Sequence, residues 1–277
     1  MLVGRFLLLA AAELPARRTM AAMAQQTCEA FEWHWLEETT STQDAAKALV
    51  KVRPEGPGCD GRPLAVATAH QTKGRGTHGR AWRDDGAGNV ALTVALPMGH
   101  VPLKPLTLVP LRVGVEIARV LSEALRARAP DCGKVSLKWP NDVLLDHKKV
   151  SGVLIEADGD HLFVGVGVNV NTFPDVPSTG PDRGREATSL RACGVEGLDA
   201  RAIAKDLAMA LSIWADGMDD PGMLILHWNH FVDWSRPLTL RDTGEEVLPL
   251  LLNPDGRLKV RPLAGGPERD LVAEYLI

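Results

Sequence analysis

Four short β-type runs between residues 135 and 170 constrain the fold more than any other feature of the chain. They cover residues 135–139, 143–145, 150–157 and 162–170. The tripeptides Asp-His-Lys and Asp-Gly-Asp separate the last three runs and have turn composition. Connections this short join antiparallel neighbours, because a parallel crossover needs about a dozen residues or more. The sequence therefore predicts an antiparallel meander.

The last of these runs has two unlike faces. Alternate residues of a strand point to opposite sides, so the valines at 164, 166, 168 and 170 share one side. The other side carries Gly165, Gly167, Asn169 and Asn171. A strand that only fills a core has no use for two glycines on one face, whereas a ligand lying across them, with Asn169 at its polar end, explains the pattern. Close packing of another strand or helix against the glycines is the alternative.

Helices and further strands flank this region. Apolar spacing predicts helices over residues 106–129, 199–218 and 222–234, and strands over residues 64–72 and 89–97. Ser41 is a good N-cap for another helix, with Asp44 placed as its capping-box partner. The Gly- and Pro-rich residues 52–63 predict a loop.

The composition changes after Ser235. Short strands are expected over residues 237–241, 247–252, 257–263 and 271–276, with a turn at residues 253–256. These strands predict a small all-β module. We therefore expect an α+β fold with an N-terminal extension over residues 1–30, a large domain over 31–234 and a small β domain over 235–277.

Charge and cysteine content narrow the class of function. The 277 residues include 31 Lys and Arg against 35 Asp and Glu, a formal net charge of −4. A general nucleic-acid or anionic-membrane binder is normally basic, so we expect no nucleic-acid and no membrane partner. The cysteines at 28, 59, 132 and 193 form no CxxC motif, which gives no support for a zinc site and favours reduced thiols. No segment reaches the roughly 18 apolar residues of a membrane helix.

The first twenty residues hold Arg5, Arg17 and Arg18 against a single acid, Glu13, and contain no serine. The favoured interpretation is an unstructured extension, which includes the case of a start assigned too far upstream. A mitochondrial transit peptide and a secretory signal are the alternatives. We expect a cytoplasmic protein, with a mitochondrial location as the alternative.

Residues 73–83 form a Gly- and Arg-rich segment with the sequence KGRGTHGRAWR. Its glycines formally match the dinucleotide-binding pattern GxGxxG, but no helix start follows and no acid ends the next strand, so we reject that interpretation. What remains is four Lys or Arg side chains and one His without an acid. Arginine forks and backbone N–H groups of a glycine-rich loop suit a phosphate or carboxylate ligand. A solvated basic turn is the alternative.

The segment KWPND, residues 138–142, stands at a strand end. Pro140 holds Trp139 extended, and Asn141 and Asp142 then turn the chain. A carboxylate there suits Mg²⁺ that accompanies a nucleotide, and a plain hairpin turn is equally compatible. In the strand that follows, Gly152 indicates a close approach of another group to the backbone.

Taken together and in order, these motifs identify a family resemblance. The matching pieces are STQ at 41–43, QTKGRG at 71–76 with GRAW at 79–82, KWPND at 138–142, KVSGVLIE at 149–156 and GVGVN at 165–169. The chain resembles biotin protein ligases, also called holocarboxylase synthetases, from about Phe31 to its C-terminus. The resemblance implies a catalytic domain like that of class II aminoacyl-tRNA synthetases, with a mixed or antiparallel sheet and flanking helices, followed by an SH3-like C-terminal barrel.

The resemblance also implies a two-step reaction. Biotin and Mg·ATP give biotinyl-5′-AMP and pyrophosphate, and a lysine of the biotin carboxyl-carrier domain of a carboxylase then attacks the mixed anhydride. Biotin and ATP are the expected substrates and Mg²⁺ the expected metal. Cations near the α-phosphate would bring two anions together and stabilise the charge that develops.

Site residues carry over by resemblance. The expected catalytic residues are Lys149, Arg75 and Asp142, with Asp142 also the candidate Mg²⁺ ligand. Expected to bind biotin are Ser41, Thr42, Gln43, Gln71, Gly74, Arg75, Gly76, Thr77, Lys149, Gly152, Gly165 and Gly167. Expected to bind ATP or the adenylate are Arg75, Arg80, Trp82, Lys138, Asn141, Asp142 and Asn169.

The chain departs from the family pattern in places. Members often carry further arginines where this chain has Thr77 and His78, and some stack adenine on a tryptophan that has no counterpart around residues 187–189. About 30 residues precede the first matched segment, which begins near Phe31, so we expect a monofunctional ligase without an N-terminal DNA-binding domain. A homodimer is compatible with the predicted meander. A lipoate or octanoate ligase on the same fold and a non-catalytic biotin-binding homologue are the alternative functions.

Overall fold

The computed structural model describes residues 31–53, 62–84, 88–101, 103–177, 185–216, 220–240 and 243–273. The predicted extension over residues 1–30, with Cys28, and also Cys59 lie outside the described residues. Within the described part of the chain, no helix combines the length and the apolar character needed to cross a membrane.

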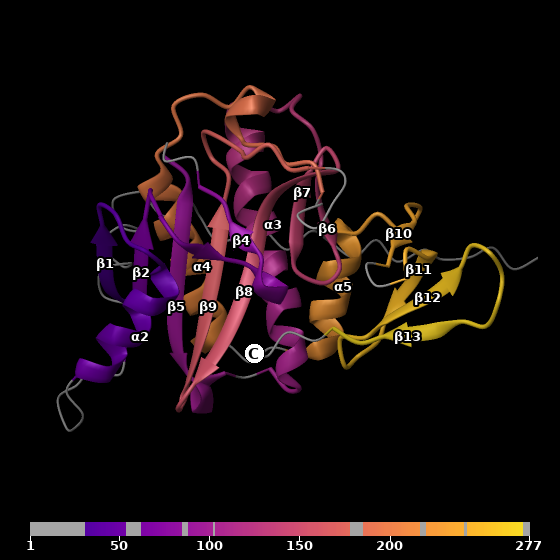
Figure 1. Ribbon diagram of the computed structural model, residues 1–277, viewed down its shortest axis with the longest axis horizontal. Helices are drawn as coiled ribbons and strands as arrows, with labels where there is room; N and C mark the ends of the chain where they lie inside the picture. Colours follow the sequence, from indigo (N-terminus) through magenta and orange to yellow (C-terminus); the bar gives the residue numbers. More distant parts are fainter. Residues whose placement is uncertain are drawn as a thin grey trace, which may run out of the picture.

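A seven-stranded mixed sheet forms the centre of the molecule (Figure 1). Its order is β1 (Glu32–Leu36), β2 (Leu64–Thr68), β5 (Val90–Pro97), β9 (His161–Val168), β8 (Lys148–Asp158), β7 (Asp142–Leu145) and β6 (Val135–Lys138). Only the β1–β2 pair in this sheet is parallel. The consecutive antiparallel pairing of β6, β7, β8 and β9 confirms the predicted meander.

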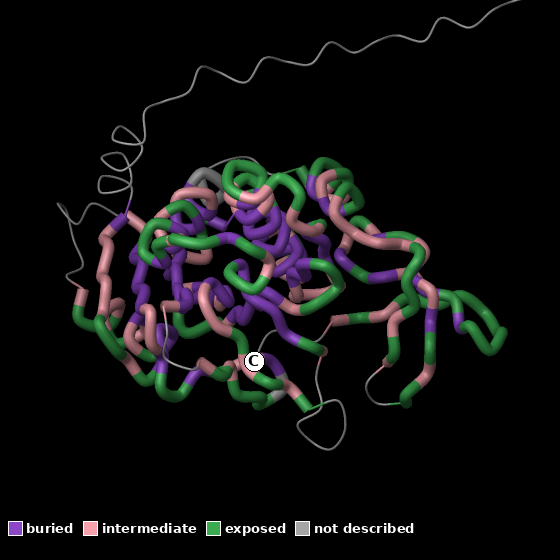
Figure 2. Tube along the Cα trace, turned by 90° about the horizontal axis from the view of Figure 1, so that it is seen from above, coloured by how far each residue is buried: buried purple, intermediate pink, exposed green. Residues whose placement is uncertain are grey.

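Helices cover both faces of this sheet. The helices α3 (Val109–Arg128) and α4 (Ala200–Asp216) pack on one face, and α5 (Pro221–Phe231) lies beside α3. The helix α2 (Thr42–Val52) packs on the other face against β2, β5 and β9. The valines of β9 belong to the main core on the α3–α4 side, as the alternation predicts, whereas Phe163 lies in the small core under α2. Figure 2 shows the buried residues gathered in these layers.

A second, antiparallel sheet lies beside the first, as the change in composition predicts. It consists of β10 (Leu238–Thr239), β11 (Glu246–Leu252), β12 (Leu258–Pro262) and β13 (Arg269–Leu271). Among the described residues, two hydrogen bonds join it to the larger part: the Thr107 hydroxyl donates to the Asp255 carbonyl at 2.9 Å, and the Trp139 indole donates to the Gly256 carbonyl at 3.0 Å. The α+β class is therefore confirmed, while the boundary at residue 235 stays a prediction.

Short elements complete the chain. They are the strands β3 (Gly74–Arg75) and β4 (Ala81–Trp82) and the 3₁₀ turns η1 (Thr77–Gly79), η2 (Met98–His100), η3 (Leu106–Leu108) and η4 (Arg191–Cys193). The Gly- and Arg-rich segment is thus a small hairpin around η1 and not an open loop. The start of the helix predicted over 106–129 is the 3₁₀ turn η3, which leads into α3.

Two sequence-based expectations were wrong in detail. The strand β1 was not predicted, although Glu32, Trp33, His34 and Trp35 alternate polar and apolar side chains; the run is short, and all five of its residues are half-buried rather than divided between a buried and an exposed face. Ser41 does occupy the N-cap of α2, but its side chain makes no capping hydrogen bond. Asp44 is no capping-box partner either, because its carboxylate binds Arg75.

Candidate active site

A cavity of about 180 Å³ lies on the glycine face of β8 and β9, beside the start of α2 and the β3–β4 hairpin. Most of the predicted site residues line it: Ser41, Thr42, Gln43, Gln71, Arg75, Gly76, Thr77, Arg80, Trp82, Asn141, Lys149, Gly152, Gly165, Gly167 and Asn169. Gly74, Lys138 and Asp142 do not line it. Residues that lie far apart in the chain therefore share one cavity, as the family resemblance implies.

One part of the cavity wall is polar and buried. The side-chain oxygen of Gln71 accepts hydrogen bonds from the backbone N–H of Thr42 at 2.8 Å and from its hydroxyl at 3.3 Å. The Gln43 amide donates to the carbonyls of Leu154 and Phe163, but its Oε1 is buried and has no hydrogen-bond partner among the described residues. Because a buried polar atom without a partner is costly, this oxygen is available to a ligand N–H group.

The glycines of β8 and β9 leave room for other side chains. A Cβ atom on Gly167 would lie 2.4 Å from Trp82 Cε2, and one on Gly165 would lie 2.6 Å from Gln43 Nε2. At Gly152 the nearest atoms, on Lys149 and Trp82, would be 3.1 Å away. The glycine face is thus in contact with three side chains that themselves line the cavity, so the close packing that was the alternative interpretation is present beside the cavity.

Lys149 enters the cavity from the beginning of β8. Its Nζ lies 2.5 Å from Asp142 Oδ1 and 5.7 Å from the centre of the Trp82 ring. The backbone fixes this position, because Lys149 N–H donates to the Glu186 carbonyl at 2.8 Å and its carbonyl accepts from Thr188 N–H at 2.9 Å. A β-bulge between β7 and β8 adjusts the register next to the lysine.

Asp142 does not line the cavity, but its carboxylate pairs with two lysines, Lys149 in the cavity and Lys138 outside its lining. Its second oxygen lies 3.6 Å from Lys138 Nζ. Burial alone would raise the pKa of the Asp142 carboxyl, but the charges of Lys149 and Lys138 outweigh burial and lower this pKa to about 2. Burial lowers the pKa of Lys138 despite the nearby carboxylate. The arrangement keeps a carboxylate ionised where it fixes the Lys149 ammonium.

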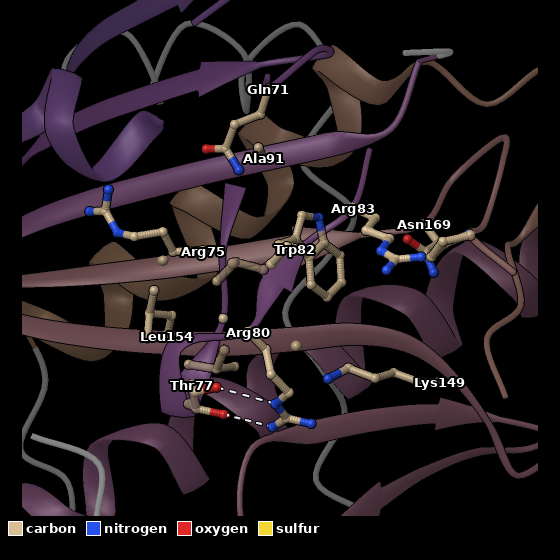
Figure 3. A pocket seen from close by; sticks show the side chains of 18 of the residues that line it. Gln71, Arg75, Thr77, Arg80, Trp82, Arg83, Ala91, Lys149, Leu154 and Asn169 are labelled. Carbon is tan, nitrogen blue, oxygen red and sulfur yellow. Dashed lines mark hydrogen bonds between the residues drawn. The ribbon is translucent and has the colours of Figure 1, made fainter. Parts of the chain in front are cut away.

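The two arginines of the hairpin point to different places (Figure 3). The Arg75 guanidinium makes two hydrogen bonds to Asp44, at 2.7 and 2.8 Å, and lies 3.3 Å from Glu156 Oε2. Arg80 donates to the carbonyl and the hydroxyl of Thr77 at 3.2 and 3.0 Å. In Figure 3 Arg80 lies near Lys149, whereas the Arg75 guanidinium lies on the opposite side of the cavity.

Asn169 stands at the end of β9. Its side-chain amide donates to the Thr188 carbonyl at 3.0 Å. Its Oδ1 is buried and has no hydrogen-bond partner within the described part of the chain, while the residue as a whole is 2% exposed. A buried acceptor without a partner, on a residue that lines the cavity, suits a ligand amino group.

Sequence reasoning missed one wall of the cavity. Pro174, Val176, Pro177, Arg185 and Ala187 line it from the segments that follow β9. These segments have ordinary loop composition. The segment with Ala187 reaches the cavity through pairing with Lys149, which no local pattern reveals. Among the described residues that line the cavity, the aromatic side chain is Trp82. No tryptophan stands near residue 187, where some family members carry the one that stacks on adenine.

Comparisons with known proteins agree with this arrangement. The model of the biotin/lipoate A/B protein ligase family matches residues 60–171. A curated Mycobacterium tuberculosis protein named biotin–[acetyl-CoA-carboxylase] ligase is 31% identical over 179 residues, which are 65% of this chain and 63% of that protein. The match thus spans less than two thirds of that relative's length.

The match to two solved structures extends over nearly the whole of each solved chain. The biotin protein ligase of Leishmania major in complex with biotin is 33% identical, with a TM-score of 0.65, and the match covers 88% of this chain and 99% of that one. The biotin protein ligase of Aquifex aeolicus in complex with biotin and ATP is 25% identical, with a TM-score of 0.65, and the match covers 88% and 97%. The resemblance seen in the five sequence motifs is confirmed, and the chain belongs to the biotin protein ligase family.

Proposed function

We propose that this chain is an ATP-dependent biotin protein ligase that forms biotinyl-5′-AMP and transfers biotin to a lysine of a biotin carboxyl-carrier domain. One observation carries the proposal: a single cavity joins buried polar groups near the start of α2 to the Lys149 ammonium, across a floor of glycines. Such a cavity suits a ligand with N–H groups at one end, a slender apolar body and a carboxylate at the other end, which describes biotin.

In this proposal the polar groups of Thr42, Gln43 and Gln71 hold the ureido ring. Gly152, Gly165 and Gly167 let Trp82, Gln43 and Lys149 lie close to the sheet, which leaves room in the cavity beside these side chains for the body of biotin. The Lys149 ammonium holds the carboxylate and attracts the α-phosphate of ATP. It thereby reduces the repulsion between two anions and stabilises the charge that develops as a carboxylate oxygen attacks phosphorus and pyrophosphate leaves. The carrier lysine then attacks the acyl carbon, and AMP leaves.

We assign the nucleotide to the part of the cavity that holds Trp82, Arg80 and Asn169. The Asn169 oxygen is available to the adenine amino group, the Trp82 ring offers a stacking face, and Arg80 offers a cation to a phosphate. Asn141 donates to the Val153 carbonyl at 2.9 Å and supports the turn behind this region. Lys138 acts through Asp142, because it does not line the cavity.

Magnesium enters the proposal as part of the substrate Mg·ATP. The described residues contain no cluster of three or more His, Cys, Asp or Glu side chains placed to hold a metal ion. The Asp142 carboxylate already faces two ammonium groups, so a directly bound Mg²⁺ would have to displace Lys149. Phosphate oxygens and water therefore suit the ion better than Asp142 does.

Finer features of the fold complete the proposal. We assign the larger part to the class II aminoacyl-tRNA synthetase-like fold and the β10–β13 module to the SH3-like barrels, with the boundary near residue 235. A cytoplasmic location, where carboxylase carrier domains and reduced cysteines would both be found, fits the same assignment.

Pyrophosphate–ATP exchange tests the proposed activity and separates it from lipoate ligation. The protein is incubated with Mg·ATP and labelled pyrophosphate, with biotin, with lipoate, with octanoate or with no acid. We expect exchange that depends on biotin alone. Exchange that depends on lipoate or octanoate, or biotin binding without any exchange, would overturn the proposal.

A further inference from the structure

Three elements of the structure meet at Arg75. Asp44 comes from the first turn of α2, Arg75 from β3, and Glu156 from β8. The contacts to Asp44 use both terminal nitrogens of the guanidinium and both carboxylate oxygens, at 2.7 and 2.8 Å, and Glu156 adds contacts at 3.3 and 3.4 Å. Lys47, one turn further along α2, also joins this cluster, because its Nζ lies 2.8 Å from Glu156 Oε2.

This geometry differs from the one that a phosphate-binding role requires. An arginine binds a phosphate through the same planar fork of N–H groups that Arg75 already directs at a carboxylate. Figure 3 shows this fork pointing away from Lys149, whereas Arg80 lies near the lysine. The hydrogen bond to Asp44 raises the pKa of Arg75 and lowers that of Asp44, so both groups stay charged throughout the physiological range.

The contacts connect the hairpin to the rest of the site. Arg75 pairs with Ala81 across the two short strands, and the turn between them carries Thr77 and Arg80. The hairpin also places Trp82 over Gly167. With two strands of two residues each, the hairpin has few backbone hydrogen bonds of its own, and an isolated hairpin is marginally stable in water. Its position over the cavity therefore depends on contacts with neighbouring elements.

We propose that Asp44 and Glu156 are positioning residues that latch the β3–β4 hairpin over the cavity by clamping Arg75, and that Arg75 acts as the moving half of this latch. The inference rests on the proposed function, because the latch matters through the ligand that it encloses. It assigns Arg75 to retention of the ligand and not to contact with the reacting atoms. Biotinyl-5′-AMP, which fills both halves of the cavity, is the ligand most dependent on it.

The size of the effect follows from the exposure of the pair. The side chains of Arg75 and Asp44 are 38% and 53% exposed, so solvent weakens the attraction and a change of about tenfold is the upper limit. Arg75 binds Asp44 through two hydrogen bonds, and its other partner, Glu156, is only 15% exposed. We therefore expect a larger effect on dissociation than an ordinary surface ion pair would give. We expect Asp44→Asn to speed dissociation of biotinyl-5′-AMP about fivefold.

The test is a double-mutant cycle on dissociation of biotinyl-5′-AMP, measured by chase with unlabelled biotin and ATP. The cycle compares the unmodified protein, Asp44→Asn, Arg75→Ala and the double variant. Arg75→Ala should speed dissociation at least as much as Asp44→Asn, because it also removes the contact with Glu156, and Asp44→Asn should add nothing once Arg75 is absent. Asp44→Glu should restore most of the retention, because a carboxylate is again available to the guanidinium.

The chain supplies a matched control in Asp158→Asn. Asp158 pairs with Lys51 at 3.9 Å and so joins the same two elements, α2 and β8, without touching Arg75. This control should leave dissociation unchanged, and thermal melting of every variant checks that each is folded.

A second measurement separates latching from chemistry. The single-turnover rate of biotinyl-5′-AMP formation at saturating biotin and ATP should change less than twofold in Asp44→Asn. Additive effects in the cycle, or a loss of more than tenfold in this rate for Arg75→Ala with Asp44→Asn unaffected, would overturn the latch and return Arg75 to the reacting atoms. If the unmodified protein forms no biotinyl-5′-AMP, the proposed function itself fails before any variant is compared.

Discussion

At the scale of single residues, Asp142 links the stability of the site to pH. Its pKa of about 2 lies below the ordinary value of about 3.9. A carboxyl whose pKa is lowered by folding stabilises the protein above its unfolded pKa, and this contribution disappears as the pH falls from about 4 to about 2.

We therefore predict a pH-dependent difference between the unmodified protein and Asp142→Asn. Denaturant titrations should show a difference in the free energy of unfolding of about 2 kcal/mol or more at pH 7, because the variant also leaves Lys149 and Lys138 without their counter-ion. The difference should shrink between pH 4 and pH 2. A difference that stays constant over this range would show that the ion pairs contribute nothing.

Gly167 allows Trp82 to lie on the sheet. In Gly167→Ala the new methyl group would lie 2.4 Å from the indole, so the ring must move into space that we assign to the ligand. We predict a loss of biotin affinity of at least about tenfold, since displacing a packed ring costs about 1–3 kcal/mol.

Gly152→Ala is the matched control for Gly167→Ala. Its methyl group would lie 3.1 Å from the flexible end of Lys149 and from the edge of Trp82, so a small shift accommodates it. Calorimetric titration with biotin should show a clearly smaller effect than at Gly167. Equal affinities in all three proteins would mean that the glycine face is only structural.

Some of these residues could be predicted from the sequence and others could not. The period of two in β9 is a local property of the chain, so it predicts correctly that Gly165, Gly167 and Asn169 share one face. The partners of Arg75 are 31 and 81 positions away, and neither has a distinctive neighbourhood. An acid-free segment looked like an anion site, although one of its arginines is neutralised by acids from other elements.

At the scale of elements, short turns made the pairing of the meander strands predictable. Where the connections are long, the sequence did not predict which strands pair or which loops line the cavity. The strands β6 to β9 follow each other with tight turns, so their pairing follows from the chain order. The parallel pairing of β1 with β2 depends on a longer connection, through α2, which does not fix which strand lies beside β1. For the same reason the walls formed by residues 174–177 and 185–187 could not be assigned from sequence.

The KWPND turn between β6 and β7 also supports the smaller sheet through the Trp139 indole. We predict that Trp139→Phe lowers the free energy of unfolding by about 1–2 kcal/mol, because the Gly256 carbonyl loses its donor. Trp33→Phe is the control, because the buried Trp33 N–H has no hydrogen-bond partner among the described residues. Urea titrations that rank the control as equally or more destabilised would contradict this role.

At the scale of the whole molecule, the two sheets and the family comparisons describe a protein whose functional groups converge on one cavity. The formal net charge of −4 conceals local pairs of opposite sign on both sides of that cavity, at Lys149 with Asp142 and at Arg75 with Asp44. The first pair holds the cation that the proposed chemistry needs, and the second holds the hairpin that encloses the ligand. Catalysis and retention are thus assigned to separate ion pairs.

The most direct test of this account is transfer of biotin to a purified carrier domain, with Mg·ATP, by the unmodified protein and by Lys149→Ala. We predict a covalent biotin on one lysine of the carrier with the unmodified protein, detected by mass spectrometry. The folded variant should transfer at least about 100-fold more slowly, the loss expected when a group that stabilises developing charge is removed. Transfer by Lys149→Ala at the unmodified rate, or no transfer by the unmodified protein, would contradict the account.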